Sequence, residues 1–144
     1  MEPRISLVTL GVQDLAKSVA FYRDVVGWTP SPGPPEIAFF DLNGVIFSLF
    51  PQKELVADFG GTEASGATIV GSALAHNARS KDEVDAIFAG LRERGATIVK
   101  EPQEVFWGGY SGYFEDPDGH KWEVAFNPFW TVLEDGRISL KKPE

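Results

Sequence analysis

The order of elements that this sequence indicates, a strand, then a helix, then further strands, occurs twice. Residues 41–47 (DLNGVIF) parallel residues 116–122 (DPDGHKW) at a constant offset of 75 positions. The residues that precede the two helices, Asp14 and Ser80, are separated by 66 positions. The offsets differ because the loops between helix and hairpin differ in length. An internal repeat of this kind predicts two modules of the same architecture.

Each module has only about sixty residues, which is small for an independent core. We therefore expect an α+β fold in which two βαβββ modules pair about a pseudo-twofold axis. The cleft between them is the expected ligand site. The whole chain, 1–144, is predicted to be a single domain. It comprises module 5–59, linker 60–71, module 72–128 and C-terminal tail 129–144.

The first half of the chain carries a signal for each predicted element. Apolar, β-branched residues at 5–12 predict a buried strand, and Asp14 is favourable at a helix N-terminus. Apolar side chains then recur at spacings of three and four until Gly27, which predicts a helix over 15–26. Prolines within 29–35 predict a loop. Strands at 37–41 and 45–50 and a short helix at 52–59 complete this half.

The second half repeats these signals. Ser80 and Glu83 have the spacing of a capping box, in which two side chains accept hydrogen bonds from free amides at a helix start. The helix that follows has apolar residues on one face and ends at Gly95. Strands are predicted at 72–78, 97–100, 112–115 and 121–126.

Charge and composition exclude several function classes. The chain has 13 Lys and Arg against 21 Asp and Glu, a formal net charge of −8, whereas nucleic acids and anionic membranes bind basic surfaces. It has no cysteine, which excludes disulfides, thiolate metal sites and cysteine nucleophiles. No apolar run approaches the roughly 18 residues of a membrane span. We therefore predict a cytoplasmic protein whose partners include neither nucleic acid nor a membrane.

Two segments resemble a known family. They are residues 12–22 (VQDLAKSVAFY) and residues 112–124 (GYFEDPDGHKWEV). Both are similar to segments of the vicinal oxygen chelate superfamily, which includes glyoxalase I, extradiol dioxygenases and the fosfomycin-resistance and bleomycin-resistance proteins. The resemblance extends from Ile5 to Pro128 and implies the fold of that family. It does not select a reaction, because this scaffold hosts several chemistries.

The resemblance also implies four positions for metal ligands, one on the first and one on the last strand of each module. In the enzymes of the family these are typically His, Glu, His and Glu. In this chain they are Leu7, Ser48, Ala73 and Glu123. One carboxylate without an imidazole does not hold a divalent metal tightly. We therefore predict neither a metal nor another cofactor.

Other residue types that bind metals do not replace the missing ligands. His76 and His120 each lie three residues from a ligand position, and an odd separation along a strand places a side chain on the opposite face. Asp116 and Asp118 invite comparison with a calcium loop, but the later oxygen ligands of such a loop are missing. We interpret both as turn-forming residues.

The predicted binding site combines strands that line the expected cleft with a loop rich in glycine. Glu123 is its central group, because it is a carboxylate between apolar neighbours in a strand that faces the cleft. Trp107 and Tyr110 flank two glycines, a pattern that indicates an aromatic lid. The predicted binding residues are Leu7, Thr9, Ser48, Phe50, Ala73, Ala75, Asn77, Trp107, Tyr110 and Glu123.

Two functions remain open. The leading hypothesis is a protein of the bleomycin-resistance type, which binds a small organic molecule in the cleft without a metal and without transforming it. The alternative is a lyase, isomerase or dioxygenase of the same superfamily. In that case Glu123 is the predicted catalytic residue, as a base or a metal ligand. The apolar cluster from Phe126 to Trp130 further predicts a homodimer.

Overall fold

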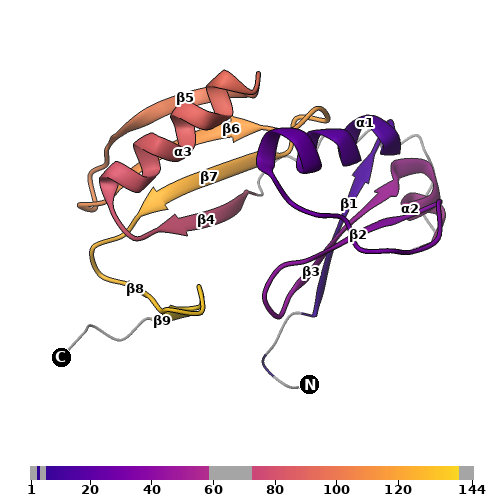
Figure 1. Cartoon of the computed structure of the whole chain (residues 1–144), viewed down its shortest axis with the longest axis horizontal. Coiled ribbons are helices and arrows are strands. Elements are labelled where there is room, and N and C mark those ends of the chain that lie inside the picture. The colour runs from indigo at the N-terminus through magenta and orange to yellow at the C-terminus, as the bar shows by residue number, and fades with distance from the viewer. Residues whose placement is uncertain (1–2, 4–5, 59–72, 140–144) are drawn as a thin grey trace. The chain divides into compact units, whose positions relative to one another are not determined.

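The computed structural model describes residues 3, 6–58 and 73–139 (Figure 1). The chain divides into two compact units, Met1–Val70 and Gly71–Glu144. The predicted linker, 60–71, lies outside the described residues. Both units contain β-sheet and helix, so the predicted α+β class is confirmed.

The first unit contains a mixed sheet of three strands. Its elements are β1 (Leu7–Val12), α1 (Leu15–Ala20), the π-helix η1 (Phe21–Val26), β2 (Ala38–Asp41), β3 (Ile46–Pro51) and α2 (Gln52–Asp58). The strand order is β1-β3-β2. Strand β1 runs parallel to β3, and β2 runs antiparallel to it.

The helix predicted over 15–26 is confirmed in its extent, but its hydrogen bonding changes to π geometry at Phe21. The Asp14 side chain caps its first turn, as predicted. At the other end, the amide of Gly27 donates to the carbonyl of Tyr22 at 3.0 Å. Gly27 has φ 92°, which ends the helix because glycine adopts this conformation without steric strain.

Four aromatic side chains form the core of the first unit. Tyr22 stacks on Trp28 with ring centroids 5.6 Å apart, and its ring lies 4.8 Å from that of Phe47. Phe40 completes the cluster and is fully buried, as is Tyr22. Burial of these rings stabilises the unit through the apolar area removed from water.

One strand of the expected βαβββ pattern is reduced in the first unit. Among the described residues, an isolated bridge from Ser31 to Phe39 of β2 takes the place of a further edge strand. Pro30 and Pro32 flank Ser31. Since proline has no amide hydrogen for a ladder, a strand does not extend in either direction from this bridge.

The second unit has the full βαβββ pattern. Its elements are β4 (Leu74–Ala78), α3 (Lys81–Glu93), β5 (Thr97–Glu104), β6 (Tyr110–Glu115), β7 (Lys121–Phe126), β8 (Thr131–Val132) and β9 (Ile138–Ser139). The main sheet has the order β4-β7-β6-β5, with β4 parallel to β7 and the other pairs antiparallel. Strands β8 and β9 form a short hairpin within the predicted tail.

Helix α3 covers one face of the second sheet (Figure 1). The Ser80 hydroxyl accepts a hydrogen bond from the amide of Glu83 at 3.1 Å. The Glu83 carboxylate accepts one from the amide of Arg79 at 2.5 Å. The predicted capping box is therefore confirmed, with Arg79 rather than Ser80 as the second donor. The buried apolar residues of the helix are Val84, Phe88 and Leu91.

The strand registers confirm the repeat. Thr9 of β1 lies opposite Ser48 of β3, and Ala75 of β4 lies opposite Glu123 of β7. Thr9 and Ala75 are 66 positions apart, and Ser48 and Glu123 are 75 apart, which are the two offsets of the sequence repeat. The two pairs therefore occupy equivalent places in the two units.

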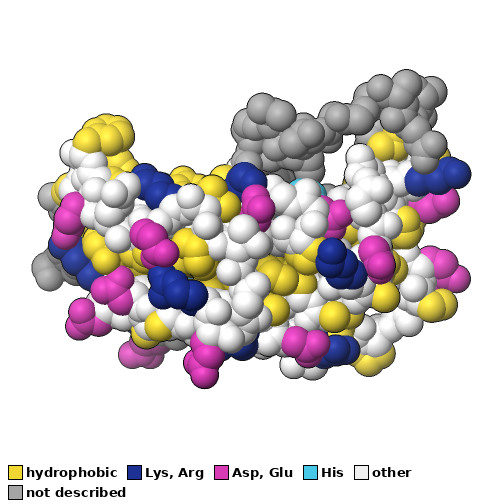
Figure 2. All heavy atoms as spheres, turned by 90° about the horizontal axis from the view of Figure 1, so that it is seen from above, with side chains coloured by type: hydrophobic (Ala, Val, Ile, Leu, Met, Phe, Trp, Pro, Cys, Tyr) yellow, Lys and Arg dark blue, Asp and Glu magenta, His cyan; other side chains and the backbone are white. Residues whose placement is uncertain are grey.

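The surface carries charges of both signs. On the face shown in Figure 2, basic, acidic and hydrophobic side chains are interspersed over the described residues. No helix in the described part of the chain is long and apolar enough to cross a membrane.

Gly112 of β6 marks a close approach between the sheet and α3. A Cβ atom at this position would lie 2.6 Å from Phe88 Cζ and 2.8 Å from the carbonyl oxygen of Lys100. Phe88 is 1% exposed, and the second neighbour is backbone, so neither has room to move aside. The position therefore requires glycine.

We expect Gly112→Ala to lower the free energy of unfolding by about 1–3 kcal/mol, the usual effect of overpacking a core. Gly33→Ala is the matched control, because a Cβ atom there makes only ordinary contact with Phe39, at 3.5 Å. Urea unfolding followed by circular dichroism measures both. Equal stability of the Gly112→Ala protein and the original protein would contradict this account of the packing.

Candidate functional site

The face of the second sheet that is turned away from α3 carries the candidate site. Side chains alternate between faces along a strand. Phe114 and Trp122 are buried on the α3 side. Their neighbours Tyr113 and Glu123, which lie opposite each other in the β6–β7 ladder, face the other way. The packing of the helix therefore determines which residues are left for binding.

Irregularities in β5 add two more polar residues to this face. Lys100 lies opposite Tyr113, and Gln103 lies opposite Ser111, with a register shift between the two pairs. In a regular strand, side chains three positions apart point to opposite faces. The bulge inserts an extra residue, so that Lys100 and Gln103 both reach the face that carries Glu123.

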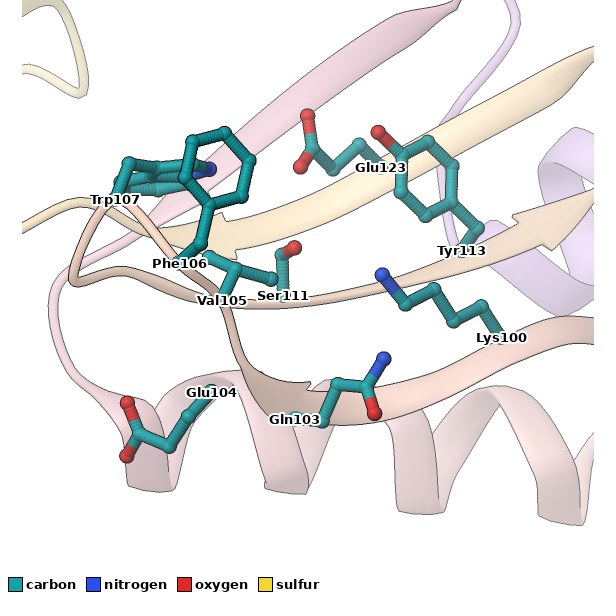
Figure 3. A pocket seen from close by; sticks show the side chains of 9 residues that line it. All are labelled: Lys100, Gln103, Glu104, Val105, Phe106, Trp107, Ser111, Tyr113 and Glu123. Atoms are coloured by element: carbon teal, nitrogen blue, oxygen red, sulfur yellow. The ribbon is translucent and has the colours of Figure 1, made fainter.

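These strands and the β5–β6 loop form a cavity of about 390 Å³ (Figure 3). This volume lies within the range of sites for small molecules. In Figure 3 the side chains of Lys100, Tyr113 and Glu123 point into the same space, and Trp107 and Phe106 stand at one end of it. The lining residues are Lys100, Gln103, Glu104, Val105, Phe106, Trp107, Ser111, Tyr113 and Glu123.

The β5–β6 loop is a hairpin turn held by its own hydrogen bonds. The amide of Gly108 donates to the carbonyl of Val105, and the amide of Val105 donates to the carbonyl of Gly109, both at 2.9 Å. Gly108 has φ 93°, which a residue with a side chain adopts only under strain. The glycines of the predicted lid therefore serve the geometry of the turn.

Gly109 also makes room for Trp107. A Cβ atom on Gly109 would lie 1.9 Å from Cη2 of the indole. The ring therefore rests directly on the backbone of the loop, and Trp107 forms an aromatic wall of the cavity. The side chain of Phe106, at the tip, is fully exposed.

Tyr113 and Glu123 interact directly. They are register partners in the β6–β7 ladder, and their side chains lie on the same face of the sheet. Partial burial raises the pKa of Tyr113 above its ordinary value of 10.0, and the negative charge of Glu123 raises this pKa further. Tyr113 therefore stays protonated at neutral pH, and its hydroxyl is a potential hydrogen-bond donor beside the carboxylate.

The predicted binding residues of the second unit are placed as follows. Trp107 and Glu123 line the cavity. Ala75 and Asn77 lie on the same face as Glu123, because Ala75 is its register partner and Asn77 is two positions further along β4. Ala73 precedes the first residue of β4. Participation of these residues in binding stays a prediction.

Tyr110 lies on the opposite face, which corrects the expectation that it shares a lid with Trp107. Its hydroxyl donates to Asp85 Oδ1 on α3 at 2.8 Å. The ammonium of Lys81, also on α3, is 6.0 Å from the centre of its ring. Because Tyr110 precedes Ser111 on β6, the two side chains alternate, and only Ser111 lines the cavity.

The predicted residues of the first unit share one face of its sheet. Leu7 and Thr9 on β1 alternate in step with Ser48 and Phe50 on β3. The hydroxyl oxygens of Thr9 and Ser48 are 2.6 Å apart and hydrogen-bonded, and Ser48 is fully buried. These two hydroxyls therefore satisfy each other. Their participation in a site also stays a prediction.

Five polar cavity residues were not among the predicted binding residues: Lys100, Gln103, Glu104, Ser111 and Tyr113. The sequence predicted a strand only over 97–100, whereas β5 continues to Glu104. The signal for Ser111 was its separation of two positions from Tyr113, which places both on one face of a strand. That signal applies only if the strand begins before Gly112, as β6 does.

The four strand positions do not fit a divalent metal. Leu7 and Ala73 have no ligand atom, and the Ser48 hydroxyl is bonded to Thr9. Only Glu123 offers a carboxylate, and stable sites for zinc, iron or nickel use three or more protein ligands. A metal held by these four positions is therefore incompatible with the residues that occupy them.

The described residues contain one other group of clustered ligand-type side chains, Asp116, Asp118 and His120. Asp116 Oδ1 accepts hydrogen bonds from the amides of Asp118 and His120, both at 2.9 Å. Its Oδ2 atom is 2.7 Å from Nδ1 of His120. The carboxylate is thus occupied in holding the turn between β6 and β7, which confirms Asp116 as a turn-forming residue.

Comparison with known proteins agrees with this architecture. Residues 4–124 match the family described as the Glyoxalase/Bleomycin resistance protein/Dioxygenase superfamily. The chain is 31% identical over 140 residues to metallothiol transferase FosB from Lysinibacillus sphaericus (strain C3-41), covering 97% of this chain and 90% of that protein. It is 32% identical over 123 residues to FosB from Shouchella clausii (strain KSM-K16), covering 83% and 77% respectively.

Solved structures share the fold. A glyoxalase-related enzyme from Fulvimarina pelagi has a TM-score of 0.84 and 35% identity, covering 97% of this chain and 99% of its own. A glyoxalase/bleomycin resistance protein/dioxygenase from Nocardioides has a TM-score of 0.74 and 30% identity, covering 88% and 84%. The repeated units define an α+β protein of the vicinal oxygen chelate type. The chain belongs to the Glyoxalase/Bleomycin resistance protein/Dioxygenase superfamily.

The titration of Tyr113 tests its contact with Glu123. We expect Tyr113 to titrate above 10.0, and Glu123→Gln to lower its pKa because the negative charge is removed. The pKa stays above 10.0 in the variant, since burial is the largest cause of the shift. Tyr110 is an internal control, because its raised pKa comes first from the hydrogen bond to Asp85. NMR titration with ¹³C-labelled tyrosine measures both. An unchanged Tyr113 pKa in the variant would contradict the contact.

Proposed function

We propose that this protein binds a small polar organic molecule on the face of the second sheet that is turned away from α3. The observation that carries the proposal is a cavity of about 390 Å³ in which the Glu123 carboxylate and the Tyr113 hydroxyl share the space with the indole of Trp107. Binding sites for small molecules combine an apolar wall with a few convergent polar groups. Glu123 is the anchor for a polar group of the ligand.

The proposed binding does not use a metal. Glu123 stands alone as a carboxylate among the four strand positions, so it is free to interact with a ligand directly. The protein then acts in the manner of a bleomycin-resistance protein, which holds its ligand and releases it unchanged. An anionic anchor in a chain with a net charge of −8 favours ligands that carry a positive charge.

A second candidate function is an enzyme of the same superfamily. It is favoured by relatives named metallothiol transferase FosB, one of which matches 97% of this chain. A transferase, lyase, isomerase or dioxygenase activity would use Glu123 as a general base or as a metal ligand. The Tyr113 hydroxyl would then hold the carboxylate in position. The residues at the other three strand positions support a base rather than a metal ligand.

Several expectations stay predictions. They are the participation of Leu7, Thr9, Ser48, Phe50, Ala73, Ala75 and Asn77 in binding, the single domain, the homodimer and the cytoplasmic location. Phe129 and Trp130, within the segment predicted to cover a dimer contact, are exposed in the structure. Exposed aromatic residues of this kind are consistent with a surface that associates.

Metal content distinguishes a metal-dependent enzyme from the metal-free functions, which are binding alone and catalysis by a base at Glu123. Protein prepared without a metal-binding tag is expected to contain far less than one equivalent of zinc, nickel, iron or manganese per chain, because one carboxylate does not retain these ions. Elemental analysis by mass spectrometry measures this content. One equivalent per chain that disappears in Glu123→Gln would contradict the proposal and favour the metal-dependent enzyme.

The role of Glu123 is tested by ligand-observed NMR with a library of small polar compounds. Compounds that bind are expected to lose about tenfold or more in affinity in Glu123→Gln, the effect of losing one charged hydrogen bond. Glu93→Gln is the matched control, because Glu93 is exposed at the end of α3. Binding that is equal in all three proteins would overturn this assignment of the site. If a reaction is found, a base at Glu123 requires turnover to fall more than affinity.

A further inference from the structure

Lys100 and Glu123 place opposite charges in one cavity. We infer that its ligand is a small zwitterion, which binds Lys100 through its carboxylate and Glu123 through its ammonium group. A flat apolar part of the same molecule packs on Trp107. This ligand class rests on the proposed function, since it specifies what the cavity binds.

The Lys100 ammonium is available to a ligand. Two other lysines of the same unit form ion pairs with carboxylates. Lys81 Nζ lies 2.5 Å from Glu104 Oε1, and the ammonium of Lys121 pairs with Glu115. Lys100 has no such partner among the described residues, and its side chain points into the cavity (Figure 3). The bulge in β5 produces this direction by placing Lys100 opposite Tyr113.

The Glu123 carboxylate is also able to accept a further hydrogen bond. The Tyr113 hydroxyl is close enough for the charge of Glu123 to raise its pKa, and a carboxylate has sites for about four hydrogen bonds. Within the described part of the chain, Glu123 and Lys100 form no ion pair with each other. A ligand with both charges therefore fits between them, and each charged group gains a partner that the protein itself does not provide.

Ligands with a single charge match this pair less well. An anion satisfies Lys100 but meets the negative charge of Glu123, and a cation satisfies Glu123 but meets the positive charge of Lys100. Like charges in one site oppose binding. A zwitterion in the matching orientation avoids both repulsions.

The remaining lining residues indicate the size and shape of the ligand. The indole of Trp107 offers a flat surface for stacking, and Val105 extends the apolar wall. Ser111, which is 2% exposed, and Gln103 provide neutral hydrogen-bonding groups. A cavity of about 390 Å³ is at the small end of the range for ligand sites. An aromatic amino acid has these properties.

The experiment compares three probes of similar shape by isothermal titration calorimetry. L-Phenylalanine carries both charges, 3-phenylpropionate carries only the carboxylate, and phenethylamine carries only the ammonium group. We expect L-phenylalanine to bind at least about tenfold more tightly than either of the others, because it gains both charged contacts. The same ranking is expected from saturation-transfer NMR.

Two variants assign the charges. Lys100→Gln is expected to weaken L-phenylalanine and 3-phenylpropionate by about tenfold or more without weakening phenethylamine. Glu123→Gln is expected to weaken L-phenylalanine and phenethylamine without weakening 3-phenylpropionate. Lys53→Gln and Glu93→Gln are the matched controls, because both residues are exposed and lie outside the cavity. Circular dichroism checks that each variant is folded.

The outcomes distinguish this inference from the proposed function. Equal binding of all three probes, or L-phenylalanine binding that Lys100→Gln does not weaken, overturns the zwitterion site but leaves a small-molecule site in place. If L-phenylalanine does not bind but a library compound binds with an affinity that depends on Glu123, the zwitterion site is overturned and the small-molecule site stays in place. If neither the probes nor any library compound binds, both proposals are overturned. Loss of L-phenylalanine binding in both cavity variants, with the controls unchanged, supports the zwitterion site.

Discussion

The packing of α3 on one face of the second sheet is the interaction on which the candidate site depends. Phe88 of the helix lies so close to Gly112 that a Cβ atom there would be 2.6 Å away. Phe114 and Trp122 are buried in the core on the side of the sheet that the helix covers. Because side chains alternate along a strand, Glu123 is then left on the opposite face. The contact that stabilises the unit therefore also selects the residues that face a ligand.

The irregular edge strand β5 gives this face its positive charge. A regular strand would point only one of Lys100 and Gln103 towards the cavity, whereas the register shift brings both. At the bulges, part of the regular pairing between β5 and β6 is lost. In return the sheet presents an ammonium group and a carboxylate within one cavity, a pair of charges that suits a ligand with two charged ends.

The repeat relates this site to the family scaffold. The parallel pair of Thr9 and Ser48 in the first unit is equivalent to the pair of Ala75 and Glu123 in the second. In the first unit two hydroxyls are hydrogen-bonded to each other, and in the second a carboxylate lies beside Tyr113. These two equivalent pairs of positions thus carry a single carboxylate, that of Glu123. We propose that this carboxylate binds a polar ligand directly.

By itself, the sequence determined the repeat, the helix caps and the side-chain parity of β7, because each depends on local hydrogen bonds or on fixed spacing. Asp14 and Ser80 cap their helices as predicted, and Glu123 lies on the face of β7 that lines the cavity. Only the tertiary structure placed Lys100 in the cavity and Tyr110 against Asp85. The face to which a strand side chain points depends on where the strand starts and where it bulges. Which of the two faces is open to a ligand depends on the face that a helix covers. These depend on contacts between segments distant in sequence, which periodicity does not contain.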